Sequence, residues 1–296
     1  MRGVKVIAVL LVVCLCFCGC SARKNLKDLS VAEGLGIDNA EQGKRVTVQT
    51  LNLAKAGNGT AALSGNVTLN TAGIGRNISS AAAAAAESLS KDLFFGQNKL
   101  LVFGMDVAVN DLATCSDYLM RSENSRPDVP VCISSGTAAQ LLDCGQNDGL
   151  VPAQAVAELL KNGQNSGFSL YVSVNEMLNL YKDKTSDICL PVITVSDESS
   201  RTSGIAIFSE SRLAGVLSGD ETVGLLFLKD KVKSGYMELE SEKYGHIGVR
   251  IIGASSKTKA FAQGETVHFK VGVKLFFSID EIENGTKESL SDAELA

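Results

Sequence analysis

The 296-residue sequence has no tryptophan, only four prolines and only two histidines. The lack of tryptophan argues against an aromatic carbohydrate cleft, and four prolines exclude a proline-rich linker. Both His246 and His268 lie in predicted strands, where we expect them to face solvent. The sequence also lacks HExxH, GxSxG, SxxK and Walker motifs. We therefore expect a protein that is not an enzyme and that holds no metal and no cofactor.

Basic residues are also in the minority. The chain has 28 Lys and Arg against 33 Asp and Glu, a net charge of −5. Nucleic-acid binding through phosphates needs a basic surface, so we exclude that class of partner. An acidic chain is also repelled by anionic lipid headgroups, so membrane attachment would need another source.

That source is predicted at the N-terminus. Arg2 and Lys5 precede an apolar run, Val6–Phe17, which is too short to cross a bilayer with ease but fits a signal peptide. Gly19 and Cys20 then begin a polar segment, the pattern of a bacterial lipoprotein signal. We predict cleavage between Gly19 and Cys20, with diacylglycerol on the Cys20 sulfur. An ordinary secretory peptide or an uncleaved anchor helix is the alternative.

Removal of residues 1–19 leaves 277 residues, with 26 basic and 33 acidic side chains and a net charge of −7. Export permits disulfides, and the mature chain keeps four cysteines besides Cys20. They are widely spaced, without a CxxC motif: Cys115, Cys132, Cys144 and Cys189. We expect buried thiols first and one disulfide second.

Strands and helices alternate in the first part of the mature chain. Strands are predicted at 29–38, 45–54 (with a bulge), 99–104 and 187–196, and helices beginning at Asn77 or Ser79 and at residues 106, 137, 151 and 173. Residues 55–77, rich in Gly, Asn and Thr, predict a loop, and the first helix is expected to end near Gly96.

The second part predicts mostly β-structure. A hairpin at 204–218 precedes a helix capped by Ser218, and apolar residues then alternate with polar ones from Val267 to Leu275, typical of a sheet with one wet face. We predict an α+β fold, with mixed sheets and helices in the N-terminal part and a largely antiparallel C-terminal sheet. The predicted units are 1–19, 20–198 (with a subdivision near 135–150) and 199–296, the last apparently incomplete because its covering layer does not follow.

Three segments, in this order along the chain, resemble the segments of one protein family. They are "CSARKNLKDLSVAEGLGID" (Cys20–Asp38), Lys99–Asp143, in which Asp117, Arg121 and Arg126 have "D…R…R" spacing, and Leu190–Gly235 with its "GIAIF" strand. In these segments the chain resembles the Ger(x)C lipoproteins, the C subunits of spore germinant receptors. It departs from that pattern at Ser21, where Trp is usual, and at Met105 and Asp106, which stand in the family's "GE.LA" region.

The resemblance implies a non-catalytic lipoprotein, C-terminally shortened, needed for nutrient-triggered spore germination. It would lie on the outer face of the cytoplasmic (spore inner) membrane beside the integral-membrane A and B subunits. No catalytic residues come with the resemblance. For Arg121 and Arg126 we expect structural ion pairs, with Asp117 one helical turn from Arg121.

A substrate-binding lipoprotein of a membrane transporter is the alternative function. That class favours regular βαβ units in two lobes around a cleft, and the antiparallel second part counts against it. The nutrient, the partner-facing surface and the oxidation state of the cysteines stay open.

Overall fold

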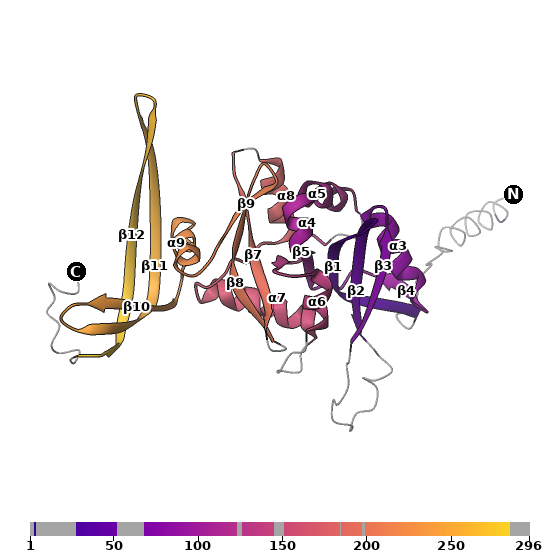
Figure 1. Cartoon of the computed structure of the whole chain (residues 1–296), viewed down its shortest axis with the longest axis horizontal. Helices are drawn as coiled ribbons and strands as arrows, with labels where there is room; N and C mark the ends of the chain where they lie inside the picture. The colour runs from indigo at the N-terminus through magenta and orange to yellow at the C-terminus, as the bar shows by residue number, and fades with distance from the viewer. Residues whose placement is uncertain are drawn as a thin grey trace, which may run out of the picture.

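The structure, a computed structural model, describes residues 28–51, 68–122, 126–144, 151–183, 185–196 and 199–284, together with Gly3 (Figure 1). The strands are β1 (Leu29–Ala40), β2 (Gly43–Leu51), β3 (Thr68–Gly75), β4 (Asp92–Phe94), β5 (Leu100–Gly104), β6 (Val131–Ser134), β7 (Ile188–Ser196), β8 (Ser199–Ser209), β9 (Arg212–Leu217), β10 (Gly235–Ser241), β11 (Gly245–Gln263) and β12 (Thr266–Ile282). The helices are α3 (Ile78–Glu87), α4 (Met105–Asn110), α5 (Leu112–Arg121), α6 (Ala138–Asp143), α7 (Pro152–Asn165), α8 (Val174–Lys182) and α9 (Asp220–Leu228).

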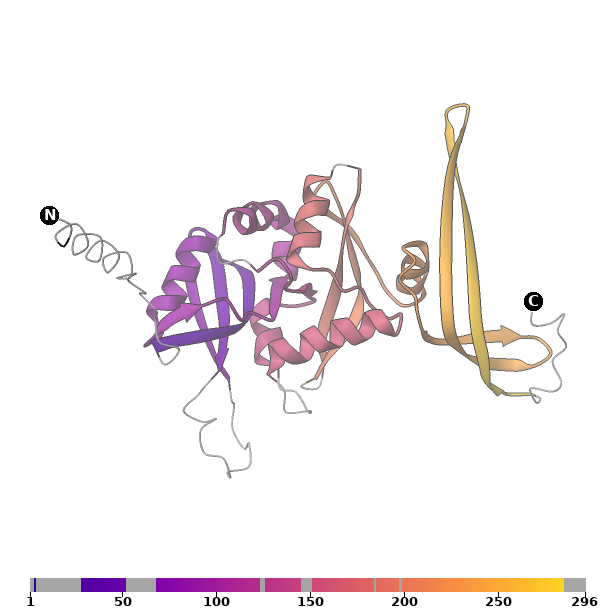
Figure 2. The ribbon, with the colours of Figure 1, turned by 180° about the vertical axis from the view of Figure 1, so that it is seen from behind.

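A nine-stranded mixed sheet forms the larger part of the molecule. Its strand order is β3-β2-β1-β5-β6-β7-β8-β9, with β4 paired to β1. The central strands β1, β5, β6 and β7 are parallel, and the flanking strands pair antiparallel. Strands β10, β11 and β12 form a separate antiparallel sheet at the other end of the molecule (Figure 2). The predicted α+β class is confirmed.

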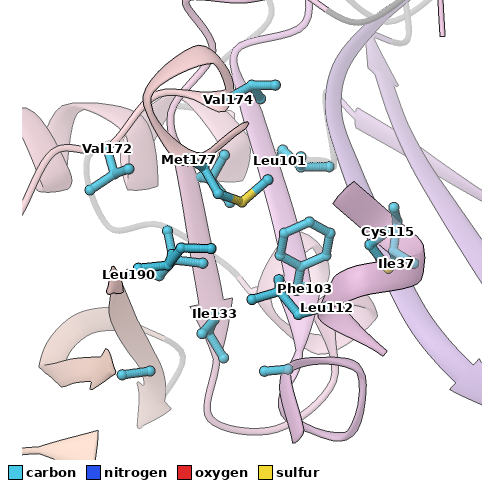
Figure 3. Packing of buried hydrophobic residues seen from close by; sticks show 14 of the residues in the cluster. Ile37, Leu101, Phe103, Leu112, Cys115, Ile133, Val172, Val174, Met177 and Leu190 are labelled. Atoms are coloured by element: carbon cyan, nitrogen blue, oxygen red, sulfur yellow. The ribbon is translucent and has the colours of Figure 1, made fainter. Parts of the chain in front are cut away.

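Two hydrophobic layers lie on opposite faces of the large sheet. Because side chains alternate along a strand, Leu101 and Phe103 of β5 point to one face and Leu100 and Val102 to the other. On the first face they pack against α5 and α8, as Figure 3 shows for Phe103 and Met177. On the second face α6 and α7 cover them. Burial of each such side chain contributes about 1.5–3 kcal/mol.

The predicted loop at 55–77 is wrong in its second half. Residues 68–75 form β3, an edge strand paired along its whole length with β2. Gly73 is needed there because α3 packs directly on the strand: a Cβ at Gly73 would lie 2.2 Å from the Ala85 nitrogen and 2.3 Å from the Ala81 oxygen. Gly73 and Gly75, two of the glycines that indicated a loop, therefore serve close helix–strand packing. The first half of the predicted loop lies outside the described residues.

Several other predicted boundaries need correction. The strand irregularity lies in β1, between Ala32 and Gly34, and not in β2. Helix α3 ends at Glu87, and β4 occupies part of the segment before Gly96. The helix expected from Asp106 is divided into α4 and α5 at Asp111, whose φ of −135° is not helical.

Helix starts follow the sequence signals more closely. Asn77 caps α3, because its side chain accepts a hydrogen bond from the Ser80 nitrogen at 2.9 Å. The Ser173 side chain likewise accepts from the Glu176 nitrogen at 3.2 Å. Ser218 does not cap α9, since Gly219 occupies the cap position without a side-chain hydrogen bond. The sequence predicted that the helix from Val151 ends just before Gly163, but Gly163 lies inside α7, which continues for two more residues.

Strands β11 and β12 make a long two-stranded ribbon. They pair from Ile247 and Ile282 at the base to Gln263 and Thr266 at the turn. Helix α9 packs against β11 near the base, where Val249 and Ile251 are buried, and the rest of the ribbon projects beyond it (Figure 1).

Candidate functional site

Asp117 and Arg121 lie one turn apart on α5. The Arg121 guanidinium donates to both Asp117 carboxylate oxygens, at 3.0 and 3.1 Å. The hydrogen bond and the charge of Asp117 raise the pKa of Arg121. Both side chains are more than half exposed, so solvent screens the pair and it contributes little to stability.

Arg126 lies apart from that pair, in the segment that leads to β6. Its guanidinium donates to the Asp128 carboxylate at 2.9 and 3.3 Å and to the Gly96 carbonyl at 3.2 Å. The hydrogen bond from Arg126 lowers the pKa of Asp128. Arg126 therefore joins the start of β6 to the loop before β5, and the structure does not bring it to Asp117.

A polar groove of about 750 Å³ surrounds Arg126 and is called here the Arg126 groove. Its walls come from the loop before β5, the segment before β6 and one side of α7. The charged and polar lining residues are Asn98, Lys99, Arg126, Asp128, Gln154, Glu158, Lys161, Gln164, Asn165 and Tyr171. No histidine or cysteine is among the described residues of this lining.

Charges of both signs line the groove. Lys161 lies 3.9 Å from Glu158 on α7, and Gln154 donates to the Glu33 carboxylate at 2.8 Å. Burial, together with the negative charges of Asp128 and Glu158, raises the pKa of Tyr171. Asn98 is 9% exposed, and its side-chain oxygen has no hydrogen-bond partner among the described residues. This lining suits polar binding and lacks the paired nucleophile and base of a hydrolytic site.

The carboxyl ends of the central parallel strands, where α/β sheets often bind ligands, are occupied by a structural contact. Asp38 at the end of β1 accepts hydrogen bonds from the Ala138 and Ala139 nitrogens, at 2.6 and 3.0 Å. These are free N–H groups of the first turn of α6. Burial raises the pKa of Asp38 although the two hydrogen bonds lower it. The "GLGID" segment thus ends in a carboxylate that binds the first turn of α6, beside Thr137, the N-cap of that helix.

Of the remaining predicted sites, the structure describes the four cysteines of the mature chain but not the predicted cleavage and lipidation site. Cys115, Cys132, Cys144 and Cys189 are all buried thiols, as first expected. Burial raises the pKa of Cys115 to about 12. Gly19 and Cys20 lie outside the described residues, so their predicted roles stay predictions.

The two histidines are exposed. His246 lies 3.6 Å from Glu238, and His268 stacks on Phe261 with ring centroids 5.4 Å apart. Within the described ranges no three His, Cys, Asp or Glu side chains are grouped to hold a metal ion. None of the helices in those ranges is both long and apolar enough to cross a membrane.

The sequence did not predict the Arg126 groove. Only Arg126 among its residues was singled out, from its spacing to Arg121. Asn98, Gln154 and Tyr171 come from segments far apart in the chain, and no local pattern connects them. Their grouping follows from the parallel order of β5 and β6 with α7 beside them.

Two family models match consecutive parts of the chain. A family described as "Spore germination protein N-terminal domain" matches residues 22–195, and one described as "Spore germination B3/ GerAC like, C-terminal" matches residues 203–296. The putative spore germination protein YfkR of Bacillus subtilis (strain 168) is 22% identical over 235 residues, 75% of this chain. The chain spans 60% of that relative's length. The crystal structure of the GerBC protein has 17% identity and a TM-score of 0.45, covering 89% of this chain and 76% of that one.

Proposed function

Because the chain belongs to the family of spore germination proteins with GerAC-like domains, we propose that it is a membrane-anchored lipoprotein subunit of a germinant receptor complex. Its partners would be the integral-membrane A and B subunits of that receptor. It would be held on the outer face of the cytoplasmic (spore inner) membrane through a lipid on Cys20. Its role there would be non-catalytic.

The observation that carries this proposal is the order of the matches along the chain. The N-terminal family match begins at residue 22, two residues after Cys20, and the C-terminal match follows it to residue 296. A lipid on Cys20 would therefore hold the N-terminal end of the matched region close to the membrane surface. The mixed charges of the Arg126 groove support a binding role, since they offer polar contacts without a reactive group.

A pull-down from spore membranes tests the proposal. The tagged wild-type chain is expected to recover two multi-pass membrane proteins. Less of the Cys20→Ala variant is expected in the membrane fraction, because it lacks the sulfur that carries the lipid. The variant should therefore recover less of both partners. Mass spectrometry of the mature N-terminus measures the lipid directly.

Cys18→Ala is the matched control, since it removes a neighbouring cysteine and keeps Cys20. Its recovery of partners should equal that of the wild type. Recovery of a transporter permease and ATPase instead would favour the substrate-binding alternative. A chain found unlipidated in the soluble fraction of vegetative cells would exclude both functions.

A further inference from the structure

Two spaces of different character meet at Asn98. The first is the polar Arg126 groove. The second, called here the apolar cavity, measures about 30 Å³ and is lined mainly by side chains that include Leu35, Ile78, Ala82, Phe95, Leu101 and Leu119. Its volume exceeds the roughly 10–15 Å³ that one water molecule needs. Asn98, Arg126 and Val129 line both spaces and therefore form the wall between them.

Asn98 has an unmet hydrogen bond in this wall. Its side chain is 9% exposed, and the amide oxygen has no partner in the part of the chain that the structure describes. Buried polar atoms in folded proteins are nearly always paired, so an unpaired one indicates that a bound group supplies the missing donor. The last torsion of an asparagine side chain is broad, so the amide can turn toward either space. A ligand at this wall should therefore carry an N–H or O–H group.

The groove is positively charged, although the whole chain has a net charge of −5. Glu33 accepts a hydrogen bond from Gln154, but it is 4% exposed and does not line the groove. Three basic and two acidic side chains do line it, which gives a net charge of +1: Lys99, Arg126, Lys161, Asp128 and Glu158. This balance favours a ligand with a single negative charge.

Lys99 and Arg126 offer donors for that charge beside Asn98. Lys99 is exposed, and within the described ranges no acidic side chain lies within 4 Å of its ammonium. Arg126 donates to Asp128 and to the Gly96 carbonyl and keeps further N–H groups free. Guanidinium and ammonium groups bind carboxylates through strong, charge-assisted hydrogen bonds.

The wall formed by α7 sets the length of the ligand. Lining residues on this helix run from Gln154 to Asn165. At about 1.5 Å per residue, they span about 16 Å. An extended polypeptide advances about 3.3 Å per residue, so this wall is as long as about five residues of peptide. The amide and charged side chains along the wall can pair with the N–H and C=O groups of such a peptide.

We propose that the Arg126 groove binds the carboxyl terminus of a partner polypeptide that ends in a small apolar residue. The terminal carboxylate would lie at Lys99 and Arg126, and the last peptide N–H would donate to Asn98. Rotation of the Asn98 side chain would admit the terminal side chain to the apolar cavity, while the preceding residues would lie along α7. Capture of a terminal carboxylate is a recurring mode of peptide recognition.

Charge and length decide between this ligand and simpler ones. A water molecule would satisfy Asn98 but would leave Lys99, Arg126 and the α7 wall without a role. A free amino acid carries an ammonium group as well as a carboxylate, so its net charge does not match that of the groove. A small carboxylate would fill only a fraction of the length of α7. The proposed site goes beyond the receptor role and does not depend on a lipid at Cys20.

Fluorescence anisotropy with the full chain tests this site. The probe is a pentapeptide that ends in valine, with a free carboxylate and a fluorophore at its amino end. The matched control is the same peptide with a terminal amide. The free acid should bind at least roughly tenfold more tightly, because the amide cannot accept the charge-assisted hydrogen bonds.

The terminal side chain tests the apolar cavity. A peptide ending in glycine should bind roughly tenfold or more weakly than the valine peptide, because it leaves the cavity unfilled. A peptide ending in phenylalanine should also bind more weakly, since its ring exceeds a cavity of about 30 Å³. Ala82→Leu fills the cavity and should remove the preference for valine over glycine while the preference for the free acid remains. Ala83→Leu, exposed on the same helix, is the control and should keep both preferences.

Lys99→Gln tests the carboxylate end of the site. It should weaken binding of the free acid by roughly two- to fivefold, as expected for an exposed charge, and leave binding of the amide unchanged. Lys91→Gln removes an exposed lysine that does not line the groove and should bind like the wild type. Circular dichroism checks that each variant is folded.

Three outcomes would overturn the proposal. The free acid and the amide could bind equally, or neither could bind. N-acetylvaline could compete as well as the pentapeptide, which would assign the groove to a small carboxylate and not to a polypeptide. Binding of the free acid could be unchanged in both Lys99→Gln and Ala82→Leu, which would place the peptide elsewhere on the chain.

Discussion

At the scale of single residues, long-range polar contacts hold the N-terminal part together. Lys44 on β2 has a side chain 9% exposed, and its ammonium lies 2.7 Å from Asp111, between α4 and α5. It also donates to the Asn39 side chain. Partial burial alone would raise the pKa of Asp111, but the hydrogen bonds from Lys44 and Asn39 and the charge of Lys44 outweigh it and lower that pKa.

Lys44→Met is expected to lower the free energy of unfolding at neutral pH by roughly 1–3 kcal/mol, because a largely buried charge-assisted hydrogen bond is lost. The lowered pKa of Asp111 stabilises the folded state above the unfolded pKa, roughly 4, and this contribution is lost as the pH falls through the folded pKa. The difference between wild type and variant should therefore shrink in acid. Urea unfolding at several pH values measures it.

Lys161→Met is the control, since Lys161 is 63% exposed in a loose pair and its loss should change stability little. A Lys44→Met variant as stable as the wild type at neutral pH would contradict the account.

The local pair and the long-range pair also differ in how far the sequence predicts them. The spacing from Asp117 to Arg121 predicts contact because a helix repeats locally, whereas Lys44 and Asp111 meet only through the fold.

At the scale of elements, the packing of α3 on β3 depends on a residue without a side chain. Gly73→Ala would place a methyl group against the backbone of α3 at Ala81 and Ala85. Since backbone cannot move aside cheaply, we expect a loss of roughly 1–3 kcal/mol or more in the free energy of unfolding. Thermal and urea unfolding measure the loss.

Gly215→Ala in β9 is the matched control, because a Cβ there meets nothing within 4 Å. It should be neutral or slightly stabilising, since alanine restricts the unfolded chain more than glycine. Equal effects of the two substitutions would argue against close packing of α3. Gly73 misled the sequence prediction, because a glycine that permits helix contact and a glycine in a loop look alike in one sequence.

At the scale of the whole molecule, the two sheets share one core. Ile251 of β11 belongs to the same cluster of buried hydrophobic residues as Leu226 of α9 and the strands of the large sheet. The register shift between Ile251 and Gly253 leaves the next residue, Ile252, 65% exposed. Two adjacent isoleucines therefore have opposite environments.

Ile251→Ala should destabilise the junction by roughly 2–5 kcal/mol, whereas Ile252→Ala should have little effect. Amide hydrogen exchange along β10 and β11 measures the change where it occurs. Protection lost equally in both variants, or in neither, would show that the small sheet does not depend on the shared core. The alternating pattern from Val267 to Leu275 predicted the partner strand β12, but the register shift that decides which isoleucine of β11 is buried has no sequence signal.

The sequence by itself determined the local features of this protein. Helix caps such as Asn77 and the alternation along β12 depend on neighbours a few residues away, so the order of residues alone predicts them. Only the tertiary structure decided which distant residues meet. The hydrogen bonds from the first turn of α6 to Asp38, the Arg126 groove and the burial of Ile251 in the shared core all require chain segments to be brought together. Contacts of that kind arise from sheet order and register, which a single sequence does not encode locally.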